Sequence, residues 1–208
     1  TIEKEVSLNT KNWFQTGGQA AYFAEPTTDQ ALLDCLEQAD KYVLPITIMG
    51  AGAKILCADG VIPSFFIRPQ LDYFSSNLNE KTVTVGAALS IEKLIEKSLD
   101  KQLSGFEDFA GIPGTVGGAL FTTLHYSSRP IRDNPTTARP TDRLTKTTIT
   151  VTRDWFSFGY NQSRLQEIFF DQKLNQEQQR FILIDATFTL NPVTSDSIAF
   201  QRGRIHEI

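Results

Sequence analysis

Residues 110–119 carry four glycines in ten positions, and this run constrains the fold more than any other feature of the sequence. The glycines are Gly111, Gly114, Gly117 and Gly118, with an Ile-Pro pair between the first two. Glycine permits positive φ and leaves the neighbouring backbone amides unshielded. We therefore expect a loop that lies directly against a bulky planar or phosphorylated ligand. The alternative is a structural turn that packs a helix onto a strand.

An earlier run, residues 48–56, repeats this chemistry. A β-branched strand that contains Ile48 ends at Gly50-Ala51-Gly52, where free backbone amides are able to hold a phosphate group. A plain strand-to-helix turn is the alternative here. The two glycine runs lie about sixty residues apart, and together they indicate one extended ligand that contacts both.

The composition is that of an ordinary soluble protein. The 208 residues are 40% hydrophobic and 21% charged, and a chain of this length forms one large domain or two small ones with a sizeable core. The formal net charge of −4 argues against non-specific nucleic-acid binding, which needs a basic surface. No run approaches the ~18 apolar residues of a membrane span, and the N-terminus lacks a signal-peptide pattern. We expect neither a nucleic-acid nor a membrane partner.

Cysteine and histidine are too scarce to build a disulfide framework or a metal site. Cys35 and Cys57 are the only cysteines, and Cys35 falls on the apolar side of a predicted helix, as expected for a buried, inert thiol. His125 and His206 are the only histidines, which excludes a histidine-rich metal centre. We therefore predict no metal site and a reducing, cytoplasmic location.

The first hundred residues follow the β-α-β order that is typical of an α/β unit. Apolar residues at a spacing of 3.6 mark the helices, and short β-rich runs mark the strands. The predicted elements are a strand at 20–24, a helix capped by Thr27 or Thr28, strands at 43–49, 64–68 and 82–87, and a helix over 91–99 capped by Ser90.

The remaining chain is less regular. Its predicted elements are a strand or short helix at 120–126, a surface excursion or loose strands at 127–147, a strand at 148–152, a short helix at 162–170, the strongest strand of the chain at 181–190, and the start of a helix at 195–208. We interpret the aromatic run 155–160 as core packing, apart from Tyr160. A solvated basic face is predicted for Arg129, Arg132, Arg139 and Arg143.

Together these motifs resemble the flavin-binding part of the UDP-N-acetylenolpyruvoylglucosamine reductases, the MurB-type enzymes of bacterial cell-wall synthesis. Residues 12–18, Asn-Trp-Phe-Gln-Thr-Gly-Gly, are similar to the family's Asn-Thr-Phe-x-x-Gly-Gly segment, and residues 50–56 are similar to its Gly-x-Gly-Ser-Asn-Leu-Leu loop. Residues 103–107 followed by 111–118 are similar to its most distinctive motif. The motifs occur in family order across nearly all of the chain.

The resemblance implies an α+β fold, in which two α/β subdomains of the vanillyl-alcohol-oxidase and MurB type hold FAD. We expect these subdomains at 1–70 and 71–192. Residues 193–208 are then the start of a truncated C-terminal segment, because the chain ends near the point where the family's substrate-binding third domain begins. The cofactor-binding residues implied are Gly50, Ala51, Gly52, Ala53, Lys54, Ile55, Gly111, Ile112, Pro113, Gly114, Thr115, Gly117 and Gly118.

The resemblance also implies partners. In such enzymes NADPH reduces the flavin, and the reduced flavin passes a hydride to the enolpyruvyl double bond of the UDP-sugar. NADPH and a UDP-sugar are therefore the expected small-molecule partners, and the oligomeric state stays open.

The chain departs from the family at several site positions. Tyr160-Asn161-Gln162-Ser163 stands where the family has Tyr-Arg-x-Ser, so a neutral amide replaces the cation that steadies the substrate's enolate. We accordingly predict no catalytic residue and keep Tyr160 and Ser163 as substrate-binding residues, with helix capping as the alternative role of Ser163. Ala53-Lys54 stands in place of the family's Ser-Asn pair. The family's proton-donating serine and late glutamate have no counterpart.

Three hypotheses stay open. The first is an FAD-dependent reductase of the MurB type, which reduces UDP-N-acetylglucosamine enolpyruvate to UDP-N-acetylmuramate in peptidoglycan synthesis. The second is a MurB-derived domain that binds FAD without catalysis, and the third is a flavin-free scaffold in a larger assembly. The motif order favours the first hypothesis, whereas Asn161 and the replaced Ser-Asn pair favour the other two.

Overall fold

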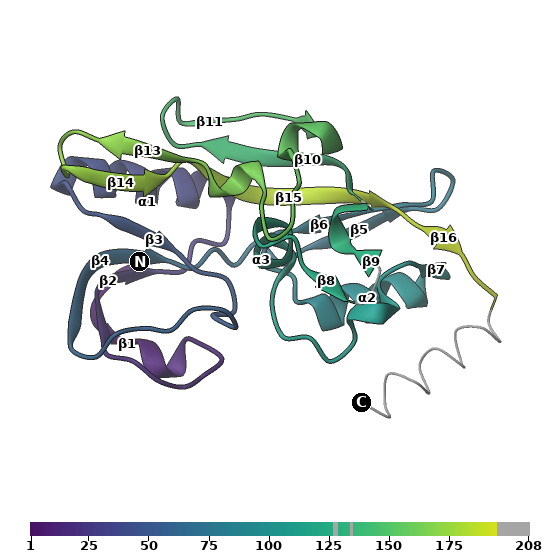
Figure 1. Ribbon diagram of the computed structural model, residues 1–208, viewed down its shortest axis with the longest axis horizontal. Helices are drawn as coiled ribbons and strands as arrows, with labels where there is room; N and C mark the ends of the chain where they lie inside the picture. Colours follow the sequence, from purple (N-terminus) through teal and green to yellow (C-terminus); the bar gives the residue numbers. More distant parts are fainter. Residues whose placement is uncertain (127–128, 134, 195–208) are drawn as a thin grey trace.

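The computed structural model describes residues 1–126, 129–133 and 135–194, and within them a four-stranded sheet and a six-stranded sheet carry three α-helices (Figure 1). Three pairs of short strands complete the described structure. Helices occur together with both parallel and antiparallel strand pairs, which confirms the predicted α+β class.

The four-stranded sheet has the order β1-β2-β4-β3. Its outer strand β1 pairs antiparallel with β2, whereas β2 and β3 both pair parallel with β4. The bounds are β1 Ile2–Ser7, β2 Gln19–Ala24, β3 Ile46–Ile48 and β4 Val61–Ile67.

Helix α1 (Asp29–Tyr42) connects β2 to β3 and covers one face of this sheet. Thr28, not Thr27, caps it, because Thr28 Oγ1 accepts a hydrogen bond from Ala31 N at 3.1 Å. The helix ends where Val43 adopts a left-handed backbone conformation, with φ of 53°. The strand predicted from residue 43 therefore begins only at Ile46.

The six-stranded sheet has the order β11-β10-β15-β6-β5, with β12 beside β10, and all of its pairs are antiparallel. Helices α2 (Ile91–Asp100) and α3 (Val116–Phe121) pack against its core. The bounds are β5 Phe74–Asn77, β6 Thr82–Gly86, β10 Pro135–Asp142, β11 Thr147–Thr148, β12 Val151–Thr152 and β15 Phe181–Thr189.

Strand β15, predicted as the strongest strand, runs along the long axis of the molecule and pairs with β10 on one edge and β6 on the other (Figure 1). Its register with β10 shifts between the pairs Arg139↔Asp185 and Pro140↔Leu183, which leaves Ile184 as an extra residue. Such a bulge re-aims the side chains that follow it. Before the bulge, alternation places Ile182 and Ile184 in the core beneath α1 and Phe181 and Leu183 in the core of the six-stranded sheet, and after it Ala186 and Phe188 face that second core as well. One strand thus contributes to both hydrophobic cores.

Short strand pairs close the edges. The β13-β14 hairpin covers the free edge of β3, where Ile46 N donates a hydrogen bond to Gln178 Oε1 at 2.9 Å. The bounds are β7 Leu103–Ser104, β8 His125–Tyr126, β9 Arg129–Pro130, β13 Ile168–Asp171, β14 Gln176–Gln179 and β16 Asn191–Pro192.

Of the two alternatives predicted at 127–147, the surface excursion is wrong and strands are present, although β10 is an interior strand of the larger sheet and not a loose one. Pro135, Ala138 and Pro140 are all buried there. The two prolines lack backbone donors, and they fall at the two register shifts between β10 and β15. Because proline is rare inside strands, local sequence rules do not predict β10.

The helix predicted at 162–170 is also wrong. A single 3₁₀ turn, Arg164–Gln166, leads into β13 instead. Asp171 Oδ1 then accepts a hydrogen bond from Lys173 N at 2.9 Å and starts the hairpin turn. For 120–126 the sequence predicts either a strand or a short helix. The structure has the end of helix α3, at Phe121, followed by the short strand β8.

The predicted basic face is wrong for two of its arginines. Arg143 is buried, lies 5.4 Å from the centroid of the Phe169 ring, and has its pKa lowered by burial. Arg139 takes part in the ion-pair network described below. The side chains of Arg129 and Arg132 lie outside the described part of the structure.

The predicted division into subdomains at residues 1–70 and 71–192 stays a prediction. Strand β15, from the second range, contributes residues to the cores of both sheets. Most of the predicted C-terminal segment, together with the helix start predicted at 195–208, falls outside the described residues. In the described ranges, no helix is long and apolar enough to span a membrane.

An ion-pair network joins the two sheets. Arg139 Nε on β10 donates to Asp185 Oδ2 on β15 at 2.8 Å, and its terminal nitrogens donate to Tyr73 OH at 3.1 Å and to Asp29 Oδ2 of α1 at 3.2 Å. Tyr73 OH also donates to Asp185. Because Asp185 is only 4% exposed, its charge depends on these donors.

Replacing Arg139 by glutamine should lower the free energy of unfolding by about 2 kcal/mol, because it leaves the Asp185 carboxylate buried without its cation. The expected loss is below that of a fully buried pair, since the Arg139 side chain is 39% exposed. Urea unfolding of wild type and Arg139→Gln measures this loss of free energy. Lys146→Gln is the control, because it breaks an exposed pair with Asp40 and should cost under about 0.5 kcal/mol. Equal losses in the two variants would contradict a stabilising network.

Stability should also fall in alkaline solution through Tyr73. Burial, and then the hydrogen bond to Asp185, raise the pKa of Tyr73 from 10.0 to about 12. Between these two values the native state holds a proton that the unfolded state has lost, so the free energy of unfolding falls as the pH rises. Below pH 10 the free energy of unfolding of the wild type should exceed that of Tyr73→Phe by about 1 kcal/mol, and this difference should vanish by about pH 12. Urea unfolding of both proteins across this range tests it, and a constant difference would refute it.

Candidate functional site

A cavity of about 770 Å³ lies between the two glycine loops, within the size range of cofactor sites. It is lined by every residue predicted from the two loops except Gly111. The start of α2, the short helix α3 and the beginning of β15 supply further walls. The structure thus brings together two loops that the sequence separates, although their contact with a cofactor stays a prediction.

The two loops meet at Gly50 and Thr115. A Cβ atom built on Gly50 would lie 2.6 Å from Thr115 Oγ1, which is closer than Cβ atoms pack in proteins. Thr115 Oγ1 is itself held in place, because it accepts a hydrogen bond from Gly118 N at 3.2 Å and caps α3. Glycine at position 50 therefore permits the close approach of the loops.

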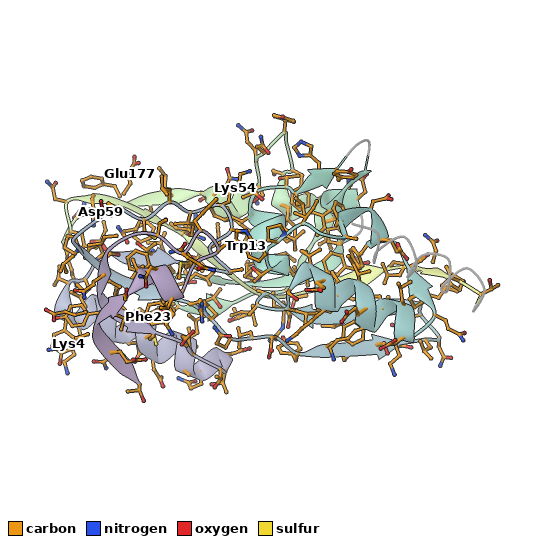
Figure 2. All side chains as sticks on the ribbon, turned by 90° about the horizontal axis from the view of Figure 1, so that it is seen from below. Lys4, Trp13, Phe23, Lys54, Asp59 and Glu177 are labelled. Carbon is orange, nitrogen blue, oxygen red and sulfur yellow. The ribbon has the colours of Figure 1, made fainter. Side chains whose placement is uncertain are left out.

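The first loop presents unused donors. The backbone amides of 50–55 donate to no acceptor within the residues that the structure describes. A loop of this kind is able to bind an anion through successive N–H groups. Gly52 is packed against the N-terminal loop, since a Cβ there would lie 2.5 Å from Asn12 Cβ and 3.5 Å from Trp13 N. Figure 2 labels Trp13 and Lys54, which lie near each other in that view.

The second loop uses its amides differently. Val116 N donates to Leu89 O at 2.9 Å, and Gly117 N donates to Ala87 O at 2.8 Å. These bonds fasten α3 to the segment between β6 and α2. The expectation of unshielded amides is therefore wrong for Gly117 and Gly118, whose donors are already satisfied.

The second loop offers a bare surface instead. Gly114 has a φ of 145°, and a Cβ built on it would meet no atom within 4 Å. A Cβ on Gly118 would meet only Thr115 Oγ1, at 3.5 Å. Both glycines line the cavity, so the space that side chains would fill there is left for a ligand. The first loop thus suits a phosphate, and the second suits a flat group pressed against backbone.

The far wall contains residues that the sequence motifs did not identify. His125 lines the cavity four residues after α3, with its Nδ1 3.3 Å from Thr123 O and its ring 5.1 Å from the Tyr160 ring. Leu165 and Gln179 also line it. The position of His125 just after the glycine motif is a sequence signal for it, whereas no local pattern marks Leu165 and Gln179, which reach the cavity only through the tertiary fold.

The residues at the family's substrate motif differ in their surroundings, and of the three only Asn161 lines the cavity. Asn161 lines the cavity, with a left-handed φ of 53°. Tyr160 is 77% exposed and lies outside the lining. Ser163 is buried outside the lining, where its Oγ donates to Phe121 O at 2.9 Å. Helix capping by Ser163 is wrong, because its side chain caps no turn. The substrate-binding role of Tyr160 and Ser163 stays a prediction.

Comparison with known proteins agrees with this geometry. The FAD binding domain family matches residues 20–135. The UDP-N-acetylenolpyruvoylglucosamine reductase of Lactobacillus gasseri is 32% identical over 192 residues, which cover 92% of this chain and 59% of that protein. The enzyme of the same name from Staphylococcus carnosus is 26% identical over 198 residues, which cover 95% of this chain and 60% of that protein. The chain therefore spans about 60% of the length of the curated relatives it matches.

A solved structure shows the same fold. The UDP-N-acetylenolpyruvylglucosamine reductase (MurB) of Thermus caldophilus aligns with a TM-score of 0.77 at 20% identity, over 100% of this chain and 68% of that chain. This confirms the predicted MurB-type fold. The family match covers more than half of the chain, and the cavity has the bare backbone that a dinucleotide needs. The chain therefore belongs to the FAD binding domain family, as a relative of the FAD-binding part of MurB-type reductases, and its cofactor is FAD.

Proposed function

We propose that this chain is the FAD-binding part of a MurB-type reductase, which uses NADPH to reduce UDP-N-acetylglucosamine enolpyruvate to UDP-N-acetylmuramate in peptidoglycan synthesis. The observation that supports this most is the single cavity walled by both glycine loops. The reductases named above match 92% and 95% of this chain. A cytoplasmic location, with NADPH and a UDP-sugar as partners, is part of the proposal.

The residues of the chain would bind and orient the cofactor. When bound, FAD would supply hydride transfer, from NADPH to the enolpyruvyl group. The amides of 50–55 would hold its pyrophosphate, and the bare backbone at Gly114 would lie against its flat surface. Apolar side chains such as Ile112, Phe121 and Leu183 would exclude water from the cavity, which strengthens electrostatic interactions inside it.

A second candidate function is FAD binding without catalysis. Asn161 lines the cavity at the position of the family's arginine, and a neutral amide stabilises a developing negative charge less than a guanidinium does. On the far wall, the described lining residues include no arginine or lysine. The flavin-free scaffold is the weakest candidate, because it provides no ligand acceptor for the unused amides of 50–55.

The first prediction concerns colour and turnover. Purified chain should absorb at about 450 nm and release nearly one FAD per chain on acid extraction. Under anaerobic conditions, NADPH should bleach this band, and UDP-N-acetylglucosamine enolpyruvate should restore it. A yellow protein that NADPH leaves unbleached would favour binding without catalysis. A protein that stays colourless after FAD is added would refute the proposal and favour the scaffold.

A second prediction tests the contact between the loops. Gly50→Ala should raise the Kd for FAD roughly tenfold, because its Cβ displaces Thr115 from the cavity wall. Thr115→Ala removes the clashing hydroxyl, so the double variant should bind FAD more tightly than the two single effects predict. Titration of apoprotein with FAD measures all four proteins. Additive effects would show that the two loops do not depend on this contact.

A further inference from the structure

We propose that Lys54 supplies the positive charge that neutralises the FAD pyrophosphate, and that this residue makes the cofactor affinity depend on ionic strength. The inference rests on the proposed FAD binding and adds an electrostatic role for a residue that departs from the family's loop pattern. The family's loop has an uncharged Ser-Asn pair where this chain has Ala53-Lys54, so the cation is not inherited from the family pattern.

Lys54 is the only charged side chain among the described residues that line the cavity. A pyrophosphate in a diester carries two negative charges, and burying them against an apolar wall without a cation is costly. The amides of 50–55 offset part of that cost as dipoles, but they supply no net charge. A lysine in the same loop supplies it.

The other basic residues next to the cavity are already paired. Arg68, which precedes the lining residue Pro69, donates from Nε to Glu25 Oε1 at 2.8 Å, and Lys11 Nζ lies 3.1 Å from Glu25 Oε2. Burial raises the pKa of Glu25, but the hydrogen bonds from Lys11 and Arg68 outweigh it and lower the pKa overall. The Glu25 carboxylate therefore stays charged and keeps both cations.

The same holds at the opposite end of the lining. Arg180 lies between the lining residues Gln179 and Phe181, and it bonds to Asp142 Oδ2 at 2.9 Å and Glu167 Oε1 at 2.6 Å. Lys54, in contrast, is exposed and forms no ion pair with any carboxylate in the described ranges. Its ammonium group is thus free to pair with a ligand.

Two ligands of the proposed reaction carry a pyrophosphate, namely FAD and the UDP-sugar. The position of Lys54 favours FAD, because the unused amides of its own loop form the anion site. Asn161 and His125, where the substrate is expected, lie on the far wall, which is built from the α3–β8 segment and the turn before β13.

Titration of the apoprotein at 50 and 300 mM NaCl tests the inference. Lys54→Gln should raise the Kd for FAD roughly tenfold at low salt and weaken its dependence on salt, because a charge-assisted contact is lost. Lys54→Arg should bind FAD nearly as wild type does. The matched control is Lys173→Gln, which changes net charge equally in the turn between β13 and β14 and should leave the Kd unchanged.

Two further ligands separate the sources of the pyrophosphate. Riboflavin lacks phosphate, so Lys54→Gln should not alter its binding, and UDP binding should change little. If the variant loses UDP affinity and keeps FAD affinity, the inference is wrong and Lys54 serves the sugar nucleotide. If Lys54→Gln binds FAD as wild type does, with the same salt dependence, the inference fails while FAD binding stands. If wild type itself binds no FAD, both the inference and the proposed function are refuted.

Discussion

The close approach of Gly50 to Thr115 is the contact on which the site depends. It joins the loop that follows β3 to the residue that caps α3, and the side chain that lies between the two backbones is that of Thr115. Thr115 serves this contact and the cap of α3 with the same hydroxyl, so the position of the helix and the width of the cavity are set together. A bulkier residue at position 50 would have to move an element that is fixed by backbone hydrogen bonds to Ala87 and Leu89.

The two sheets are held at the distance that this contact needs. Successive side chains of β15 point to opposite faces, so Ile182 and Ile184 pack beneath α1 while Phe181 and Leu183 pack in the core of the larger sheet, and one strand contributes to two cores. Arg139 and Asp185 pair at the bulge of β15 and extend the connection to Asp29 of α1. A cavity between separately moving units would change width as they moved, whereas a shared strand keeps its walls in register.

The sequence was most informative where the chemistry is local. Backbone freedom and loop chemistry depend on the residue itself, so the two glycine runs identified about half of the cavity lining, and the caps at Thr28 and Ser90 were predictable from helix-start rules. The sequence failed where tertiary contacts override local pattern. The prolines of β10 are accommodated at register shifts that only pairing with β15 creates, and Leu165 and Gln179 reach the cavity through the fold. The amide of Gly117 was misjudged for the same reason, since its acceptor, Ala87 O, lies far earlier in the chain, whereas the amide of Gly118 is used locally by the Thr115 cap.

The charges of the cavity have moved relative to the family pattern. The family places a cation at the position of Asn161, on the substrate side, and an uncharged pair at Ala53-Lys54, on the cofactor side. This chain has the opposite arrangement, and the neighbouring cations at Lys11, Arg68 and Arg180 are neutralised by carboxylates. A positive charge on the cofactor side stabilises a bound dinucleotide equally before and during a reaction, whereas one on the substrate side stabilises charge that develops only in the transition state. The arrangement in this chain therefore favours holding the cofactor, and any acceleration of hydride transfer depends on groups other than Asn161.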